Sequence, residues 1–457
     1  MKDIYLTNYS VKGIKTLDET VSLSFYKKTI TKDMDTQEYN IKGIYGMNGS
    51  GKSGIMTSVE ILRNLLLDSG YLSDPVTQNS LDALVNKRIG ELAIGAEIIS
   101  KMGGVILQFQ YNVTLGKDST GKFVIIKESL HGKPATSKKD NFIPLFDVAN
   151  GEVDYIYAND KSYGLACELE QKSVNLLSTA SMIALFREKV LALGHEKMDS
   201  LVRSNSEYFL ADALCVLVIF SINVYVYLDQ SDNHRKFLTN KSFANRDIEW
   251  KRLLDSMFHT ENEWLDVISI SENYVPKTRY VKFENTIEKL CEFIRIFKAD
   301  LQNIEIDKKE NHEYYVCDLI MVYDSYKIHA EFESTGIKKL IRLFAFIREM
   351  VNGGIVFIDE FDSNLHDVYL CALLEYLMQY GEGQLCFTTH NVGPMDILKQ
   401  NKKSIDFLSE DHKIYPWRTN GNYSPSKLYR NGMIEGSPFN VDAIDFIGVF
   451  GTGEEDE

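Results

Sequence analysis

Cysteine is scarce and scattered in this sequence, which argues against the usual cysteine-built metal sites. Six cysteines are spread over 457 residues, and none has a C-x-x-C or similar metal-ligand spacing. We interpret them as reduced core residues, because a free thiol behaves as a small apolar side chain. The sequence also has no internal repeat, no low-complexity tract and no sustained heptads. These absences exclude collagen, long disordered regions and coiled-coil rods.

Positive charge is also in short supply. Lys and Arg number 50 against 65 Asp and Glu, which gives a net charge of −15 and a pI near 5.2. A chain of this charge repels nucleic acid and anionic membranes as a whole. Contact with DNA would therefore need a local basic surface or a partner.

Targeting and membrane signals are weak. The first residues, MKDIYLTNYS, have no basic segment followed by an apolar one, so we predict a cytoplasmic protein without a signal peptide. The apolar stretch Phe209 to Leu228 is long enough to consider as a membrane span, but Asp212, Ser221 and Asn223 interrupt it. A buried helix running into a strand over 222–228 is the favoured interpretation.

The remaining composition, with 44% apolar and 25% charged residues, is that of a globular protein, and the length indicates two to three structural units or one unit with a large insertion. The order of the expected strands and helices indicates the α/β class. We predict a first unit over 1–164, a helical insertion over 165–310, and a third unit over 311–457. The expected elements, in order, are two strands within 4–25, a strand at 41–45, a helix at 55–67, a hairpin within 104–130, a helix at 336–350, a strand at 355–358, a helix at 369–380 and a strand at 384–388.

The strongest motif lies between the predicted strand 41–45 and the predicted helix 55–67. It matches the P-loop pattern G-x-x-x-x-G-K-[ST] completely and reads Gly46-Met47-Asn48-Gly49-Ser50-Gly51-Lys52-Ser53. A glycine-rich loop can curl its N–H groups around phosphates at the positive end of a helix. We therefore expect ATP at this loop, with Lys52 on the β- and γ-phosphates and Ser53 on Mg²⁺.

A second motif, Ile355-Val356-Phe357-Ile358-Asp359-Glu360, is an apolar run that ends in two carboxylates. An unbroken apolar run is typical of a buried parallel strand, and ligands bind at the carboxyl ends of such strands. Taken alone, it could be a strand exit onto a solvated turn. Together with the P-loop it predicts a Walker B segment, in which Asp359 holds the metal and Glu360 activates the attacking water.

Two further segments flank these carboxylates. Ser334 and Gly336 lie in Glu333-Ser334-Thr335-Gly336, a turn that opens an apolar helix and predicts either a second anion site or an ordinary helix cap. His390 follows the predicted strand 384–388, and there it could contact the γ-phosphate or its attacking water. Lys52 and Asp359 are 307 residues apart, a spacing that compact GTPases and kinases do not have.

The ordered set GMNGSGKS, ESTGIKKL, IVFIDEFDSNLH and FTTHN resembles an ABC-type ATPase head. It is most similar to the SMC-like group of OLD-family (overcoming lysogenisation defect) proteins and related phage-defence ATPases, such as PARIS-like or Septu-like ATPase subunits. The opening IYLTNYSVKGI is similar to the first strand pair of that group. The resemblance implies a mixed P-loop sheet with an antiparallel N-terminal subsheet. It covers roughly the first 130 and the last 145 residues.

The resemblance also implies a head-to-head homodimer or higher oligomer with ATP in the interface. Ser334 and Gly336 would then complete the γ-phosphate site of the partner head, the segment 362–365 would be the D-loop, and His390 the switch histidine. The signature is ESTG in place of an LSGGQ-like run. No Q-loop glutamine can be assigned, because Gln108 and Gln110 both lie in the predicted hairpin.

OLD-family nucleases carry a TOPRIM domain after the ATPase, but only 67 residues follow His390. Asp442 and Asp445 there have the spacing of an exposed helix face. The expected function is therefore an ATPase that controls a separate effector, such as a nuclease or toxin, in anti-phage defence. The alternatives are a DNA-repair or chromosome-associated clamp that binds DNA directly, and the ATPase of a membrane transporter.

Overall fold

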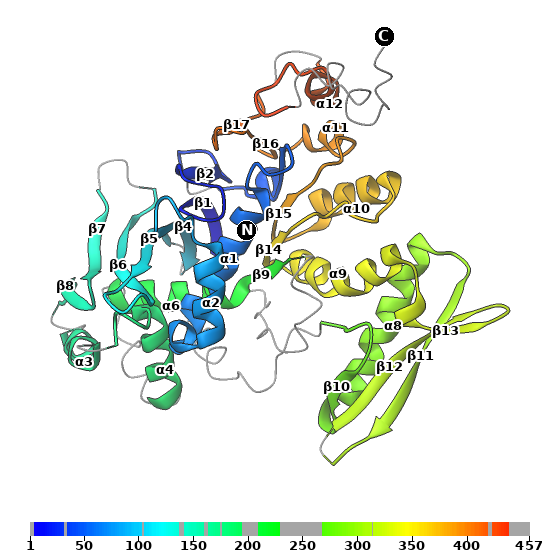
Figure 1. Cartoon of the computed structure of the whole chain (residues 1–457), viewed down its shortest axis with the longest axis horizontal. Helices are drawn as coiled ribbons and strands as arrows, with labels where there is room; N and C mark the ends of the chain where they lie inside the picture. Colours follow the sequence, from blue (N-terminus) through cyan, green and yellow to red (C-terminus); the bar gives the residue numbers. More distant parts are fainter. Residues whose placement is uncertain are drawn as a thin grey trace, which may run out of the picture.

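The computed structural model describes residues 4–31, 34–102, 105–136, 141–159, 163–173, 176–193, 209–228, 267–312, 314–418 and 423–437. Within these ranges the chain forms three β-sheets with helices between and around them (Figure 1). Asp442 and Asp445 lie outside the described residues.

The central sheet carries the predicted motifs. Its order is β17-β16-β3-β15-β14-β9, and all neighbours are parallel except the edge pair of β16 and β17. Its strands are β3 (Ile41–Gly46), β9 (Val224–Tyr227), β14 (Ile355–Ile358), β15 (Gln384–Thr388), β16 (Ile405–Leu408) and β17 (Ile414–Pro416). Every residue of β3, β14 and β15 is buried, which explains the unbroken apolar run of β14. The buried polar side chains of the other two strands have partners: Lys42 pairs with Asp406, and Gln384 and Thr388 form hydrogen bonds.

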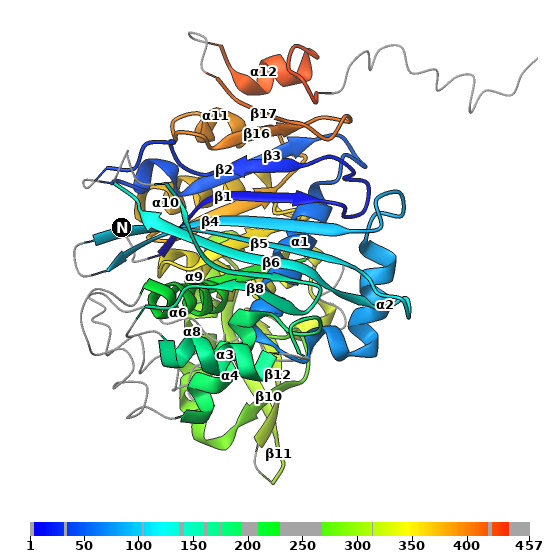
Figure 2. The same cartoon turned by 90° about the vertical axis from the view of Figure 1, so that its left-hand side faces the viewer.

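An antiparallel sheet packs beside the central one and faces the viewer in Figure 2. Its order is β2-β1-β4-β5-β6-β7-β8. Its strands are β1 (Ile4–Lys12), β2 (Val21–Ser24), β4 (Leu92–Met102), β5 (Val105–Lys117), β6 (Phe123–Pro134), β7 (Ile143–Ala149) and β8 (Glu152–Ile156). One hydrophobic core joins this sheet to the near face of the central sheet and to helices α1 (Lys52–Leu67), α4 (Met182–Leu193) and α6 (Phe209–Asn223).

One buried side chain connects the two sheets through hydrogen bonds. The Gln384 amide accepts from the Leu6 N–H at 2.8 Å and donates to the Leu6 carbonyl at 2.9 Å. An amide side chain can replace a strand neighbour in this way because it offers one donor and one acceptor side by side. β1 is thus tied to β15, which lies between the two strands that carry the P-loop and the Walker B motif.

A third, smaller sheet forms a separate lobe at the lower right of Figure 1. It consists of β10 (Asn273–Pro276), β11 (Leu301–Glu310), β12 (Tyr314–Tyr323) and β13 (Lys327–His329). Helix α8 (Tyr280–Phe297) covers it, and the first half of α9 (Thr335–Val351) packs into the same core. The second half of α9 packs with the central sheet. α9 therefore belongs to two cores.

The other helices are α1 (Lys52–Leu67), α2 (Pro75–Leu84), α3 (Tyr163–Ser173), α4 (Met182–Leu193), α6 (Phe209–Asn223), α10 (Asp367–Tyr380), α11 (Met395–Leu398) and α12 (Pro425–Arg430), with short 3-10 turns at 37–39, 71–73, 277–279 and 330–332. α1 lies between the two larger sheets and contacts α4, α6 and β9. α10 packs on the opposite face of the central sheet.

The mixed α/β class and the antiparallel N-terminal sheet are confirmed, as are the predicted strands and helices around the motifs. The large helical insertion expected over 165–310 is wrong for the described residues. β9 belongs to the central sheet, and β10 and β11 belong to the third sheet. The strand expected over 222–228 is present as β9, but nothing in the local spacing indicated that it pairs with β14 of the central sheet. The limits of the three predicted units stay a prediction.

No helix in the described part of the chain is long and apolar enough to cross a membrane. The candidate stretch divides as expected into α6, which has 15 residues, and the short strand β9. A spanning helix needs about 20 residues.

Candidate nucleotide-binding site

The P-loop has the backbone that its glycines predict. Gly49 and Gly51 have φ angles of 80° and 103°, a region that glycine adopts without strain. Gly51 is also packed closely, because a Cβ there would lie 2.4 Å from Cδ2 of Leu17. Helix α1 begins at the next residue, so the loop presents the positive end of a 16-residue helix.

The Lys52 ammonium lies inside the loop. It donates to the carbonyls of Gly46 at 2.7 Å and Met47 at 2.9 Å. Burial lowers the pKa of Lys52 to about 8, while the charges of Asp359 and Glu360 act in the opposite direction. The P-loop lysine and the Walker B carboxylates are thus close enough to interact, although they come from strands separated by β15.

Three observations test whether the loop fits a phosphate group. The Ser50 hydroxyl is buried and has no hydrogen-bond partner among the described residues. The N-cap residue Gly51 offers no side-chain acceptor, so α1 has no side-chain cap, and its first turn has no acidic residue. Around Gly49, a Cβ would meet no atom within 4 Å. Unsatisfied donors, positive charge and free space are the properties that a bound polyphosphate needs.

A hydroxyl that the sequence reasoning missed holds the two Walker B residues. Thr388, the last residue of β15, is fully buried and donates to Oδ1 of Asp359 at 2.6 Å. The same hydroxyl accepts from the Glu360 N–H at 2.8 Å. Thr388 therefore fixes Asp359 and Glu360 relative to each other.

The backbone of Glu360 is in the left-handed region, with φ of 50°. A residue with a Cβ adopts this conformation at a cost of roughly 1 kcal/mol or more, so its surroundings must stabilise it. The buried Lys339 of α9 does so by donating to the Glu360 carbonyl and to the Ser363 hydroxyl. Lys339 also lies over the Tyr227 ring, 5.6 Å from its centroid.

His390 belongs to the same site. It follows β15 and is exposed. Neighbouring atoms nevertheless partly desolvate the imidazole and lower the pKa of His390, and the charge of Lys52 acts in the same direction. The charges of Asp362, Glu360 and Asp359 oppose this change. His390 is therefore within electrostatic reach of both motifs, and the lowered pKa favours its neutral form at pH 7.

The ESTG turn forms the start of α9. Ser334 is the N-cap and accepts from the Ile337 N–H at 3.3 Å, so the helix-cap interpretation is correct as far as it goes. Thr335 donates to the Asn364 amide oxygen at 3.2 Å, and a Cβ on Gly336 would lie 2.6 Å from the Asn364 carbonyl. The turn is thus packed against segment 362–365 of its own chain. Ser334 is exposed and accessible to a second molecule.

The metal site stays a prediction. Ser53 is in the first turn of α1 and half-buried, and Asp359 is buried at the end of β14. Among the residues that the structure describes, no cluster of three or more His, Cys, Asp or Glu side chains is arranged to hold a metal. The nucleotide and water would have to supply the other ligands, which is how Mg²⁺ is bound with ATP.

Asn48, an exposed residue of the P-loop, is the remaining predicted contact and has no tested role. The sequence motifs did not identify three further residues near this site: Thr388, Lys339 and Lys15, which lies in the loop between β1 and β2. The FTTHN and ESTGIKKL segments contain the first two, but their role depends on which strands and helices are neighbours.

No family model matches the sequence, and no curated protein matches it either.

Proposed function

We propose that this protein binds ATP with Mg²⁺ and hydrolyses it to ADP and phosphate. The observation that supports this most is the position of Lys52, Asp359 and His390. They follow neighbouring parallel strands, β3, β14 and β15, at the same edge of the central sheet. Ligands of open α/β sheets bind at this edge.

The roles follow from the chemistry of each group. The P-loop N–H groups and Lys52 would bind the β- and γ-phosphates, and Ser53 and Asp359 would hold Mg²⁺. Bound Mg²⁺ would neutralise developing charge on the phosphates. Glu360 would accept a proton from the attacking water, with its position set by Thr388 and Lys339. A neutral His390 would contact the γ-phosphate or that water.

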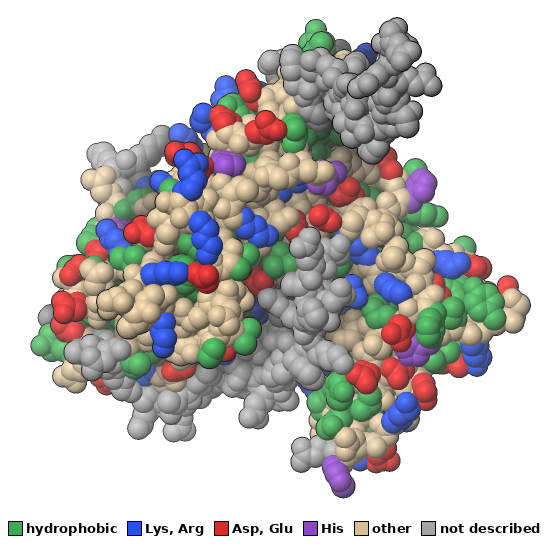
Figure 3. Space-filling view, in the orientation of Figure 1, with side chains coloured by type: hydrophobic (Ala, Val, Ile, Leu, Met, Phe, Trp, Pro, Cys, Tyr) green, Lys and Arg blue, Asp and Glu red, His purple; other side chains and the backbone are tan. Residues whose placement is uncertain are grey.

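The proposal extends to assembly and partners. Two copies would sandwich ATP, with Ser334 and Gly336 of one head meeting the nucleotide of the other, and closure would control a separate effector in anti-phage defence. The exposure of Ser334 supports the trans contact. The net charge of −15 favours a protein effector over direct DNA binding. Acidic and basic side chains are also interspersed over the face in Figure 3.

The test is Mg²⁺-dependent release of phosphate from ATP by the wild type and two variants. Lys52→Ala should fail to bind ATP, because the phosphate charge would be left uncompensated in a partly buried site. Glu360→Gln should bind ATP and turn over very slowly, because it keeps shape and loses the base. Wild-type nucleotide affinity in Lys52→Ala, measured by isothermal titration, would refute the P-loop assignment. Normal turnover in Glu360→Gln would place the base elsewhere, and His390 is the next candidate.

A further inference from the structure

The loop that connects β1 and β2 packs directly against the P-loop. Leu17 fills the space beside Gly51, and the Thr16 hydroxyl contacts the Gly49 carbonyl at 3.4 Å. Ile14 lies next to Gly54 of α1, where a Cβ would be 3.5 Å from its Cγ2. Residues 14–17 thus line the same side of the phosphate loop, and Lys15 is the only cationic side chain among them.

Lys15 has an unusual backbone that its neighbours hold in place. Its φ is 48°, in the left-handed region that residues with a Cβ adopt rarely. Its N–H donates to the Leu84 carbonyl at 2.6 Å, and its carbonyl accepts from the Asn86 amide at 2.8 Å. Strained backbone that the surrounding structure stabilises in this way is concentrated at functional sites.

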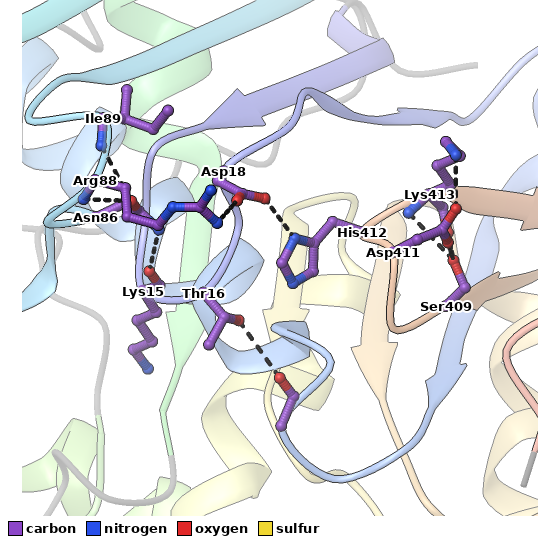
Figure 4. A network of polar contacts seen from close by, with 11 residues as sticks. Lys15, Thr16, Asp18, Asn86, Arg88, Ile89, Ser409, Asp411, His412 and Lys413 are labelled. Atoms are coloured by element: carbon purple, nitrogen blue, oxygen red, sulfur yellow. Dashed lines mark hydrogen bonds and ion pairs between the residues drawn. The ribbon is translucent and has the colours of Figure 1, made fainter.

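A polar network anchors the far side of the same loop (Figure 4). Asp18 binds Nδ1 of His412 at 2.8 Å and the Arg88 guanidinium at 2.8 Å. Figure 4 shows the Lys15 side chain pointing away from this network. Asp18 thus holds both Arg88 and His412, and Lys15 joins these contacts only through its backbone carbonyl, which accepts from Asn86.

The Lys15 ammonium has no hydrogen-bond or ion-pair partner within the described part of the chain. Lys15 is exposed as a residue, yet neighbouring atoms partly desolvate its ammonium and lower the pKa of Lys15. The charge of Asp359 opposes this change. Lys15 therefore offers an unpaired positive charge at the edge of the P-loop, where the phosphates of a bound nucleotide would lie.

We propose that Lys15 is a second cation of the phosphate site and contacts the terminal phosphate of ATP bound to the P-loop of the same chain. This inference rests on the proposed ATP binding and adds a residue that none of the sequence motifs contains. Contact with the phosphates follows from the packing of residues 14–17 against Gly49 and Gly51, which places the Lys15 side chain at the edge of the phosphate loop.

The test uses variants that respect the left-handed backbone. Lys15→Asn removes the charge, and asparagine tolerates this conformation better than alanine does. Lys15→Arg keeps the charge. The matched control is Lys87→Asn, which removes one exposed lysine that pairs with Asp82 outside the site. Dissociation constants for ATP and ADP are measured by isothermal titration in the presence of Mg²⁺, and turnover by phosphate release.

Loss of a charge-assisted contact predicts that Lys15→Asn weakens ATP binding by about 10-fold and ADP binding by much less, while Lys15→Arg stays near the wild type. ATP binding and turnover in Lys15→Asn equal to those of Lys87→Asn would overturn the proposal. Tighter ATP binding would overturn it too, since the lysine would then compete with the metal at Asp359. If the wild type itself binds no ATP, the proposed function fails, an outcome that differs from a normal Lys15→Asn variant.

Discussion

Thr388 offers a quantitative test of how the Walker B carboxylates are held. Thr388→Val keeps the shape of a fully buried side chain and removes its hydroxyl. Two hydrogen bonds are lost, the 2.6 Å bond to Asp359 and the 2.8 Å bond from the Glu360 N–H. A bond to a charged group contributes about 1.5–3 kcal/mol and a neutral one about 1 kcal/mol, so the free energy of unfolding should fall by about 3 kcal/mol.

The neighbouring Thr389 provides the control. It is also buried, but among the described residues its hydroxyl accepts only from the Asn391 N–H, at 2.9 Å, so Thr389→Val should cost about 1 kcal/mol. Urea unfolding of both variants measures the difference. Because the displaced Asp359 is the proposed metal ligand, the Mg²⁺ concentration needed for half-maximal turnover should also rise by about 10-fold or more in Thr388→Val. Equal stability losses with unchanged Mg²⁺ dependence would refute the bridging role.

Two other predictions concern Lys52 and the ESTG turn. The pKa of Lys52 is about 8 in the folded chain against an ordinary value of 10.5, so the folded state binds fewer protons at this amine between those pH values. The free energy of unfolding of the nucleotide-free wild type, measured relative to Lys52→Met, should therefore rise from pH 8 to 10.5 and stay constant below pH 8. Urea unfolding at these pH values measures it, and the absence of a rise would contradict the burial of this charge. Glu360→Gln with ATP should form a more compact or larger species than with ADP in small-angle X-ray scattering. Adding Ser334→Arg should abolish that change while ATP binding persists, and normal closure would reduce the turn to a helix cap.

The sequence was most informative where the signal is local. The P-loop glycines, the apolar run of β14 and the helical spacing of α1 predict their elements within a few residues, because each depends on its own backbone preferences and burial. β9 was expected as a strand inside the predicted helical insertion, and β11 was absorbed into that insertion. β11 forms a hairpin with the next strand, β12, whereas the place of β9 in the central sheet comes from pairing with β14, far away in the sequence. Such pairing is tertiary information that overrides the local spacing.

The same division applies to the candidate site. Lys52, Asp359 and Glu360 were found because a motif names them. The motif does not reveal that β15 lies between β3 and β14, so the bridging role of Thr388 is invisible until the strand order is known. Lys15 is harder still to predict, because its position depends on its own left-handed backbone. A hydrogen bond from its N–H to the Leu84 carbonyl, at the end of α2, holds that backbone in place.

α9 has a mechanical consequence because its two halves belong to different cores. A helix of 17 residues is about 25 Å long and bends little, so the third sheet and the central sheet share one stiff rod. A tilt of about 5° about one end would move the other end by about 2 Å over this length. Lys339, which holds the Glu360 carbonyl, is on this rod. Lys339 lies 12 residues from the Val351 end, so a force on the surface of the third sheet that tilts the helix about that end by this angle would displace the contact to Glu360 by about 1.5 Å.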